Sequence, residues 1–174
     1  GLPYTDSGNT TCADASRDNC VTQAARDVYY SYTSPICQQV TANTCALAGY
    51  DTRLEARTGG ACPGDVQLAC NDDFCGLQSQ ITFDAGTGQI YYIIVNGFVS
   101  GSYGAYTLNV TGVAGNQAND LCANAYPINF LPYESAGNTI CAANEAGNCV
   151  GPTSNNVFYR LNLGNANCRY VTVS

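Results

Sequence analysis

Residues 89–95 of the chain read Gln89-Ile90-Tyr91-Tyr92-Ile93-Ile94-Val95, a short run that is rich in β-branched and aromatic side chains. The turn-forming segments Gly86-Thr87-Gly88 and Asn96-Gly97 bound this run on its two sides. A run of this length and composition between turn residues predicts a buried β-strand. Residues 105–110 alternate between apolar and polar side chains and follow the Gly-rich segment 101–104. We expect these two strands to pair as a hairpin.

Four further segments have the composition of β-strands and are separated from one another by turn residues. They are residues 28–32, 38–42, 52–57 and 80–84, and the turns contain Ser34-Pro35, Gly59-Gly60, Pro63-Gly64 and Asn71-Asp72. Several short strands at this spacing favour two packed antiparallel sheets over a parallel sheet with crossover helices. Residues 18–27 are the one weak candidate for a helix. The chain is therefore predicted to be an all-β antiparallel sandwich.

The chain repeats itself after 129 residues. Leu2-Pro3-Tyr4 recurs as Leu131-Pro132-Tyr133 at this offset. Further matches at the same offset are Gly8-Asn9-Thr10 with Gly137-Asn138-Thr139, Cys12 with Cys141, Cys20 with Cys149, and Val28-Tyr29-Tyr30 with Val157-Phe158-Tyr159. Cys37 matches Cys168 after an insertion in the second copy. Ordered matches at one fixed offset indicate tandem copies of one structural unit.

The repeat also predicts where the units begin and end. Residues 1–113 form one nearly complete unit that lacks its first strand, residues 114–118 form a linker, and residues 119–174 form the N-terminal part of the next copy. A unit begins near Asn119, whereas the chain starts at the position equivalent to Phe130. Either these boundaries are an arbitrary window on a longer polymer, or the opening segment of each unit contacts an adjoining unit. The expected contact residues are Asn119, Asp120, Leu121, Tyr126, Ile128, Phe130 and Tyr133.

The chain contains eleven cysteines and no histidine. Zinc sites usually combine Cys with His or use closely spaced Cys pairs, and neither pattern is present. Disulfides are the better interpretation, and they imply an extracellular or otherwise oxidising compartment. One full unit has an even number of cysteines once the counterpart of Cys122 is included, but the sequence does not decide how they are connected. The cysteines expected to form disulfides are Cys12, Cys20, Cys37, Cys45, Cys62, Cys70, Cys75, Cys122, Cys141, Cys149 and Cys168.

Charge is sparse in this sequence: only 11% of the residues are charged, Lys is absent, and the net charge is -7. A surface without clustered Lys and Arg is poorly suited to bind the phosphates of nucleic acids or anionic lipids. No stretch approaches the roughly 18 consecutive apolar residues of a membrane-spanning helix. We therefore expect neither nucleic-acid binding nor membrane insertion.

Six short motifs occur in an order that is familiar from one protein family. They are Asn119-Asp120 with Cys122, Val28-Tyr29-Tyr30, Tyr50-Asp51-Thr52 with Leu54, Cys70-Asn71-Asp72-Asp73, Tyr91 to Val95, and Tyr106-Thr107-Leu108-Asn109-Val110. In this order they resemble the bacterial pre-peptidase C-terminal (PPC-like) domain and its cysteine-rich relatives in secreted multidomain proteins, over most of one unit. The resemblance implies a jelly-roll-like β-sandwich that accompanies other modules and contributes adhesion, carbohydrate contact, secretion or spacing without chemistry of its own.

The inventory of side chains argues against catalysis. Ser and Cys nucleophiles usually depend on a His or Lys base, and the chain has neither residue. Glu134 and Glu145 of the second copy correspond to Thr5 and Ser16 of the first, so the copies do not share a pair of carboxylates. We predict that the chain is not an enzyme.

One acidic turn offers hard oxygen ligands of the kind that Ca²⁺ prefers. It comprises Asn71, Asp72 and Asp73, joined by Asp51. Its spacing matches no EF-hand loop, and Asn and Asp are also ordinary turn residues whose side chains bond backbone amides. Calcium is the only cofactor that the sequence suggests, and both interpretations of this turn stay open.

The sequence also holds candidate contacts with sugars. Asn9 and Asn109 begin N-glycosylation sequons, and Asn43 begins a rarer variant that ends in Cys. Most of the thirteen tyrosines are expected inside strands, where aromatic residues are favoured. Tyr4, Tyr103 and Tyr133 are the better-exposed candidates for stacking on a glycan.

Together these patterns predict a non-catalytic structural repeat of an extracellular fibre or surface glycoprotein. Its units are joined head to tail, and its main partners are further copies of itself. The alternative is a carbohydrate- or protein-binding accessory module of a larger secreted enzyme or adhesin. The two alternatives predict different neighbours for the unit: many copies of itself, or a catalytic domain beside one or two copies.

Overall fold

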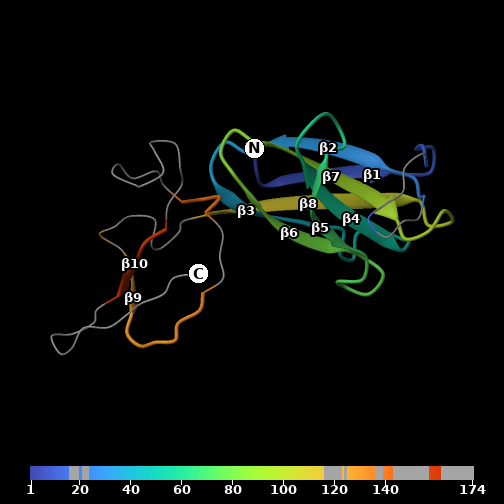
Figure 1. Cartoon of the computed structure of the whole chain (residues 1–174). Helices are drawn as coiled ribbons and strands as arrows, with labels where there is room; N and C mark the ends of the chain where they lie inside the picture. Colours follow the sequence, from blue (N-terminus) through green and yellow to red (C-terminus); the bar gives the residue numbers. More distant parts are fainter. Residues whose placement is uncertain are drawn as a thin grey trace, which may run out of the picture. The chain divides into compact units, whose positions relative to one another are not determined.

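The computed structural model describes residues 1–15, 20, 24–115, 123, 125–135, 139–142 and 157–161. The chain divides into two compact units, Gly1–Gly115 and Asn116–Ser174. The described residues contain ten β-strands and no α-helix (Figure 1). Within these residues there is also no helix of the length and hydropathy needed to cross a membrane.

The first unit is a sandwich of two four-stranded sheets. The first sheet has the order β1-β8-β3-β6, with β1 at Tyr4–Asn9, β8 at Ala105–Ala114, β3 at Gln38–Asn43 and β6 at Gln80–Ala85. The second sheet has the order β2-β7-β4-β5, with β2 at Val28–Thr33, β7 at Ile90–Gly97, β4 at Thr52–Thr58 and β5 at Val66–Asn71. All neighbouring strands in both sheets are antiparallel. The predicted all-β antiparallel sandwich is confirmed.

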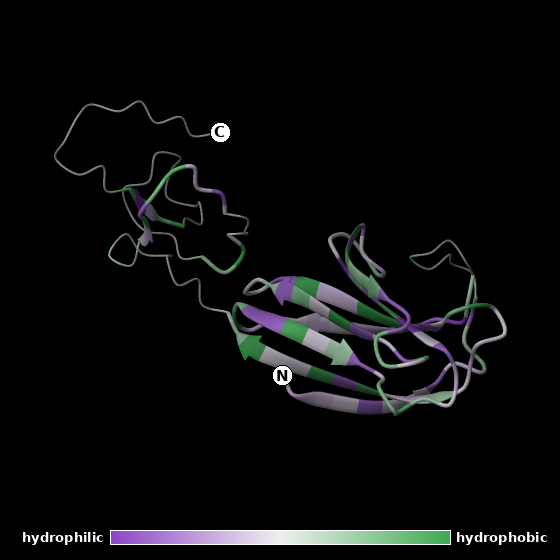
Figure 2. Cartoon of the chain, turned by 90° about the horizontal axis from the view of Figure 1, so that it is seen from below, coloured by the Kyte–Doolittle hydropathy of each residue, from purple (hydrophilic) through white to green (hydrophobic). Residues whose placement is uncertain are grey.

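The core lies between the two sheets. Alternation along the strands directs one set of side chains inward, and Figure 2 shows hydrophobic and hydrophilic residues alternating along several strands of this unit. The buried side chains include Val40, Phe83 and Leu108 from the first sheet and Leu54, Tyr91 and Ile93 from the second. Each fully buried aliphatic or aromatic side chain stabilises the fold by about 1.5–3 kcal/mol.

The strand β4 is buried on both of its faces. Its inward residue Leu54 and its outward residues Arg53 and Glu55 are all fully buried. The Arg53 Nη2 donates to Asp72 Oδ2 at 3.0 Å, and the Arg57 Nη1 donates to Glu55 Oε1 at 2.5 Å. Buried charges persist only when they are paired in this way. At β4, therefore, both the outer face and the core face of the second sheet are buried.

The expected hairpin between residues 89–95 and 105–110 is wrong. The strand β7 pairs with β2 and β4, whereas β8 pairs with β1 and β3, so the two strands belong to different sheets. The connection from residue 98 to 104 crosses the end of the sandwich. It turns sharply after β7, since a Cβ on Gly97 would lie only 1.9 Å from the carbonyl oxygen of Ser102. The inward residues of both strands then fill the core from opposite sides.

Two strands were not expected from the sequence, and the helix candidate is not supported where it is described. The strands β1 and β5 have mostly polar or exposed side chains, so neither has a clear alternating pattern. Residues 24–27 of the helix candidate are not helical, and most of its other residues lie outside the described ranges. Both unexpected strands lie at the edge of a sheet, where only one side must pair.

Disulfides link several of the described cysteines. Cys20 is bonded to Cys70, Cys45 is bonded to Cys75, and Cys37 and Cys141 are also disulfide-bonded. Cys12 and Cys62 are exposed free thiols in separate turns, so the expected pairing is not found for these two. Cys122, Cys149 and Cys168 lie outside the described residues. Disulfides of this number are typical of a secreted or periplasmic protein.

The described part of the second unit contains two short strands. The strand β9 covers Tyr126–Ile128 and β10 covers Tyr159–Leu161. They pair in parallel, with Tyr126 opposite Tyr159 and Ile128 opposite Leu161. This short parallel pair differs from the strand pairs of the first unit, which are all antiparallel.

Candidate functional site

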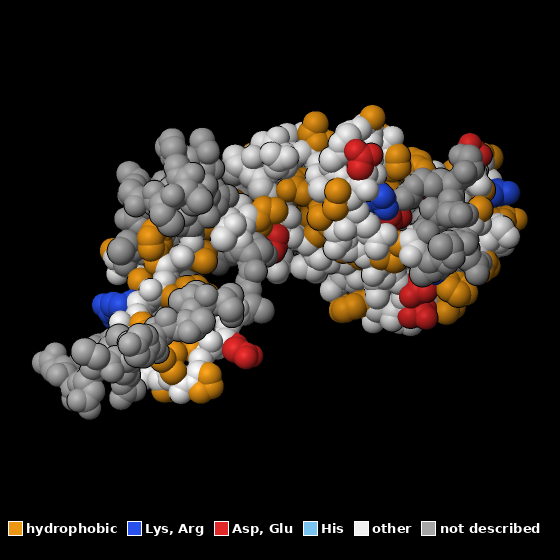
Figure 3. Space-filling model, in the orientation of Figure 1, with side chains coloured by type: hydrophobic (Ala, Val, Ile, Leu, Met, Phe, Trp, Pro, Cys, Tyr) orange, Lys and Arg blue, Asp and Glu red, His pale blue; other side chains and the backbone are white. Residues whose placement is uncertain are grey.

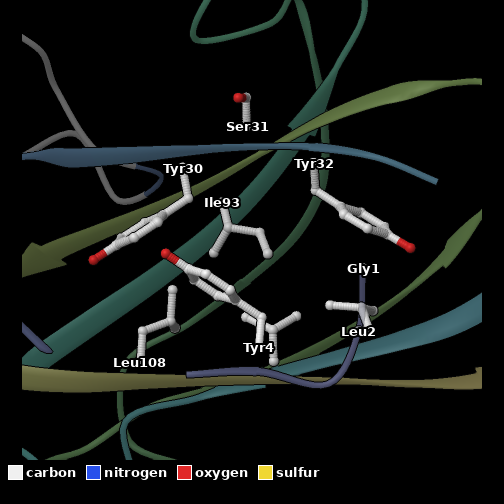
Figure 4. A pocket seen from close by; sticks show the side chains of 9 residues that line it. Gly1, Leu2, Tyr4, Tyr30, Ser31, Tyr32, Ile93 and Leu108 are labelled. Carbon is white, nitrogen blue, oxygen red and sulfur yellow. The ribbon is translucent and has the colours of Figure 1, made fainter. Parts of the chain in front are cut away.

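An apolar cavity opens along one seam of the first unit, between the edge strands β1 and β2. Its volume is about 260 Å³. From the first sheet and the two residues before it, the lining residues are Gly1, Leu2, Tyr4, Leu108 and Val110. From the second sheet they are Tyr30, Ser31, Tyr32 and Ile93. Figure 4 shows Tyr30 and Tyr32 directed from β2 into the space between the sheets, with Tyr4 opposite them. Among the described residues β1 and β2 are both edge strands, so no further described strand closes the core at this seam.

Tyr30 is the central side chain of this seam. Its ring meets the ring of Tyr4 edge-on, with 6.3 Å between centroids, a favourable aromatic geometry. Its hydroxyl donates to Asp6 Oδ2 at 2.9 Å and lies 2.8 Å from the Tyr106 hydroxyl. The seam thus combines an apolar wall with a short hydrogen-bonded chain at one end.

The tyrosine hydroxyls at this end of the seam are held in the neutral form. Burial raises the pKa of Tyr30, and its hydrogen bonds with Tyr106 and Asp6 raise it further. Burial also raises the pKa of Tyr106, against the opposing effect of its hydrogen bond with Tyr30. Nearby, burial raises the pKa of Tyr50 to about 12. These groups act as structural hydrogen-bonding groups and not as acids or bases near neutral pH.

Gly8 makes room for this arrangement. A Cβ at Gly8 would lie 2.4 Å from the Tyr106 hydroxyl oxygen, which is closer than real atoms approach. Only glycine therefore lets β1 pass beside the Tyr106 ring. Gly8 belongs to the repeated Gly-Asn-Thr motif, so a residue found by the repeat has a packing role beside the seam.

The second unit repeats the central contacts of the seam. Tyr133 and Tyr159, the counterparts of Tyr4 and Tyr30, have ring centroids 5.9 Å apart. The Tyr159 hydroxyl lies 3.1 Å from Ser135 Oγ, and Ser135 is the counterpart of Asp6. The repeat therefore extends from the sequence to side-chain contacts in both units.

A third ring joins this pair in the second unit. Tyr126 of β9 has ring-centroid distances of 6.3 Å to Tyr133 and 6.3 Å to Tyr159. Tyr126 and Tyr133 were among the contact residues expected from the sequence, but Tyr159 was not placed beside them. The only sequence signal for Tyr159 was its match with Tyr30 at the repeat offset.

The predicted inter-unit contact residues are partly described. Tyr126 and Ile128 lie on β9, which pairs with β10 of the same unit, and Phe130 is 76% exposed. Asn119, Asp120 and Leu121 lie outside the described residues. Contact of this segment with an adjoining unit stays a prediction.

Two of the four candidate calcium ligands have other partners, whereas the buried Oδ1 of Asp51 has no hydrogen-bond partner among the described residues. Asp72 is held by the Arg53 guanidinium, and Asn71 Oδ1 accepts a hydrogen bond from the Gln80 backbone N–H at 3.3 Å. Burial raises the pKa of Asp51, and the neighbouring carboxylates of Asp73 and Asp72 raise it further. Among the described residues no three or more His, Cys, Asp or Glu side chains are arranged to hold a metal ion. Calcium binding stays a prediction.

The two sequons lie on or next to the first sheet. Asn9 is exposed at the end of β1, and its Oδ1 accepts a hydrogen bond from the Thr11 backbone N–H at 2.8 Å. Asn109 is half-buried on β8, and its Oδ1 accepts a hydrogen bond from Thr5 Oγ1 at 2.8 Å. Occupancy of either sequon by a glycan stays a prediction.

Uncharged polar pairs follow the outer side of the same sheet, and they were not expected from the sequence. Across neighbouring strands, Ser7 Oγ lies 2.9 Å from Thr107 Oγ1, and Thr41 Oγ1 lies 3.2 Å from Thr82 Oγ1. Such cross-strand pairs stabilise a sheet by roughly 0.2–1 kcal/mol each. The only sequence signal for these pairs was the alternation of polar side chains along the strands. This alternation shows which side chains meet only once the strand register is known.

The exposed tyrosines proposed for glycan stacking have different neighbours within their own units. Tyr4 belongs to the seam, whereas the Arg26 guanidinium lies 4.1 Å above the ring centroid of Tyr103. Tyr133 belongs to the ring cluster of the second unit. A sugar site at these residues stays a prediction.

Comparison with known proteins gives distant structural neighbours only. No family model matches the chain, and no curated protein matches it. One similar solved structure is PliG of Aeromonas hydrophila, a periplasmic inhibitor of g-type lysozyme, with 15% identity over 63% of this chain and 83% of that chain and a TM-score of 0.41. Another is the pre-peptidase C-terminal domain of the collagenase from Bacillus anthracis, with 17% identity over 63% of this chain and 90% of that chain and a TM-score of 0.37. The second is a domain of the family that the sequence motifs resemble, and similarity this low indicates no function.

Proposed function

We propose that the chain is a non-catalytic structural segment of an extracellular fibre or surface glycoprotein, in which units of this type follow one another head to tail. One observation carries the proposal: the contact between Tyr4 and Tyr30 recurs between Tyr133 and Tyr159. A side-chain contact that is repeated with the sequence indicates that the second copy is built on the same plan. Repeated units that contact only their neighbours form open linear arrays.

The cross-links of the first unit suit a segment that bears load. The bond between Cys45 and Cys75 spans 30 residues, and the bond between Cys20 and Cys70 spans 50 residues. Loops of this size correspond to a stabilisation of about 3–4 kcal/mol per disulfide in the chain-entropy model. The first bond ties the loop after β3 to the loop after β5, and the second ties the connection between β1 and β2 to β5 itself. Both bonds therefore hold together segments that are distant in the sequence.

The surface of the unit suits a polymer that is exposed to the outside medium. On the face seen in Figure 3, charged side chains form separate spots among hydrophobic side chains, uncharged polar side chains and backbone. The hydroxyl pairs of the first sheet and the sequon at Asn109 lie on this type of uncharged surface. A glycan on Asn109 would project from β8, beside the threonines and serines that could carry further sugars.

A binding module is the competing function, and the seam is the observation that favours it. The cavity presents an exposed tyrosine ring, Tyr4, next to apolar residues of the core. Tyrosine combines an apolar ring with a polar tip and is common at binding surfaces. On this alternative, the seam takes a ligand on behalf of a larger secreted enzyme or adhesin.

Electron microscopy of the protein as its own cells export it tests the proposal. We expect filaments or linear arrays with a regular spacing close to the length of one unit. The coding sequence around this chain should then contain further copies at the same 129-residue spacing. Discrete particles, together with one or two copies beside a catalytic domain, would contradict the proposal and favour the binding module.

A further inference from the structure

A shallow groove lies on the first sheet of the first unit, at the end of the sandwich where β1 ends and β8 begins. Its volume is about 690 Å³, within the roughly 300–1,000 Å³ of ligand pockets. One wall is residues 46–49, in the connection between β3 and β4, and the floor is formed by the last residues of β1 and the first residues of β8. The groove shares no lining residue with the seam between β1 and β2.

Every side chain that lines this groove is uncharged. Ser7 and Thr107 contribute hydroxyls, and Asn9 contributes an amide. Leu47 and Ala105 are exposed and add apolar surface beside these polar groups. The groove therefore presents hydrogen-bonding groups and apolar atoms together, without a charge to be neutralised.

We propose that this groove binds a short stretch of a neutral polysaccharide. A wholly apolar partner would bury the hydroxyls without replacing their hydrogen bonds to water, which is unfavourable. An ionic partner would meet no side chain of opposite charge in the groove. A neutral sugar chain returns the hydrogen bonds through its own hydroxyls and places C–H groups against the apolar wall. The site adds a ligand to the proposed structural segment and does not depend on how the units are arranged.

The two hydroxyls of the groove are positioned by the strand register. Ser7 on β1 lies opposite Thr107 on β8, and their Oγ atoms are 2.9 Å apart. A hydroxyl has one donor and two acceptor positions. A pair that shares one hydrogen bond therefore keeps a donor and several acceptor positions for a ligand, which is the combination that a sugar hydroxyl needs.

The wall formed by residues 46–49 is held in place from both of its neighbours. The Leu47 carbonyl oxygen accepts a hydrogen bond from the Thr107 backbone N–H at 2.8 Å, and the Ala48 carbonyl oxygen accepts one from Gln78 Nε2 at 3.3 Å. The disulfide at Cys45 fixes the chain just before the wall. A wall that is already ordered loses little conformational entropy when a ligand binds, which favours affinity.

The uncharged surface continues along the sheet beyond the groove. The next pair of outward side chains is Thr5 and Asn109, which are joined by a hydrogen bond of 2.8 Å, and Asn43 of β3 lies opposite Asn109. Outward residues that are two positions apart on a strand are separated by roughly 7 Å. A chain of sugars that leaves the groove along β8 therefore meets a second row of hydroxyl and amide groups, which favours a polymer over a single sugar as the ligand.

Binding of labelled oligosaccharides to the intact 174-residue chain tests the proposal. The probes are fluorescent cellohexaose, chitohexaose and mannohexaose, with hexagalacturonate as an anionic probe of the same length. The protein is made in a host that adds no N-linked glycans, because Asn9 lines the groove and begins a sequon. We expect saturable binding of at least one neutral probe with a Kd below about 1 mM, and binding of the anionic probe that is about tenfold weaker or more.

Two glycine variants locate the binding site. A Cβ at Gly49 would meet no atom within 4 Å, so Gly49→Tyr adds a ring at the groove without a clash at its Cβ. This variant should weaken binding by about tenfold or more. The matched control is Gly101→Tyr, since a Cβ at Gly101 also meets no atom within 4 Å and Gly101 does not line the groove. The control should change the affinity by less than about threefold.

Two double variants test the hydroxyls. Ser7→Ala with Thr107→Val removes the hydroxyl pair of the groove and should weaken binding by about tenfold, because hydrogen bonds to the sugar are lost. Thr41→Val with Thr82→Val removes another hydroxyl pair of the same sheet, outside the groove, and should change the affinity by less than about threefold. Circular dichroism and a melting curve establish that each variant is folded.

Three outcomes would overturn the inference. They are no saturable binding of any neutral probe by the folded wild-type chain, equal binding by Gly49→Tyr and the wild type, and equal losses in the two hydroxyl double variants. Linear arrays seen without sugar binding would overturn this site and leave the proposed function in place. Sugar binding without linear arrays would do the reverse, so the two failures are separate results.

Discussion

The same pair of tyrosines occurs in both units of the chain, but in different surroundings. In the first unit, Tyr4 and Tyr30 lie at an open seam above a core that two four-stranded sheets enclose. In the second unit, Tyr133 and Tyr159 are joined by Tyr126 from a short parallel strand. Both tyrosines of the pair are therefore part of the repeated sequence. The surroundings of the pair are a two-sheet core in the first unit and a ring cluster in the second, and the following predictions compare the two.

The largest expected effect is a loss of stability in the first unit that leaves the ring cluster of the second unit unchanged. Leu54 is fully buried between the sheets, so Leu54→Ala should lower the free energy of unfolding of the first unit by about 2–5 kcal/mol. Thermal unfolding followed by circular dichroism measures this loss. NMR signals of Tyr159 should not shift in the folded protein, because the ring cluster has its own contacts.

The control for this variant is Val66→Ala on β5. Val66 is 54% exposed, and a substitution there should cost less than about 1 kcal/mol. Equal losses in Leu54→Ala and Val66→Ala would show that the core between the two sheets does not stabilise the unit.

The next prediction concerns the stability that a disulfide gives to the first unit. Replacing both Cys45 and Cys75 by serine removes a bond that spans 30 residues and should cost about 3–4 kcal/mol. Chemical denaturation in the absence of reductant measures the loss. Cys12→Ser and Cys62→Ser should change stability by less than about 0.5 kcal/mol, since both cysteines are exposed free thiols. A large loss in either single variant would show that these thiols are paired in solution.

The hydrogen-bonded chain at the seam predicts how stability depends on pH. The pKa of Tyr30 is raised above its ordinary value of 10.0, so the folded protein retains a proton that the unfolded chain releases. The contribution is therefore complete below about pH 10 and is lost as the pH rises above that value. Denaturation curves between about pH 8 and pH 12 should show this decline, and Tyr30→Phe should make it shallower. A Tyr30→Phe curve parallel to that of the wild type would contradict the assignment.

The smallest effect compares the two rings directly. Tyr4→Ala removes one edge-to-face contact and should destabilise the first unit by about 1 kcal/mol, because the Tyr4 ring is partly exposed. Tyr133→Ala removes two ring contacts in the second unit and should broaden or shift the NMR signals of Tyr126 and Tyr159. Signals that stay unchanged would show that the ring cluster does not form in solution.

Much of the fold follows from the sequence, and the failures have a physical reason. The pattern of residues 89–95 and of five other segments predicted six of the eight strands of the sandwich, because buried strands need alternating or continuous apolar side chains. The edge strands β1 and β5 were not predicted, since few of their side chains are buried. The hairpin prediction failed because local patterns do not reveal whether two strands lie side by side or face each other across a core.

The candidate site was predicted only in part. The repeat singles out Tyr4 and Tyr133 in the sequence, because a fixed offset marks residues that belong to one plan, whereas Tyr126 was expected only as part of the opening segment of a unit. The seam itself required the order of strands in both sheets, since it arises where two edge strands meet. The contact of Tyr30 with Asp6 and Tyr106 joins residues that are far apart in the sequence, and no local pattern indicates it.

Amide hydrogen exchange of β2 is the most direct test that the two units share one plan, in a chain that carries a copy of residues 123–129 placed before Gly1, the position that the 129-residue offset gives them. We expect slower exchange of at least one backbone amide among Tyr30, Ser31 and Tyr32, by about tenfold or more, because the added segment should pair with β2 as β9 pairs with β10. The same extension with Tyr126→Asp and Ile128→Asp in the added copy should leave exchange as it is in the original chain. Unchanged exchange at all three amides with the unmodified extension would contradict a shared plan of the two units.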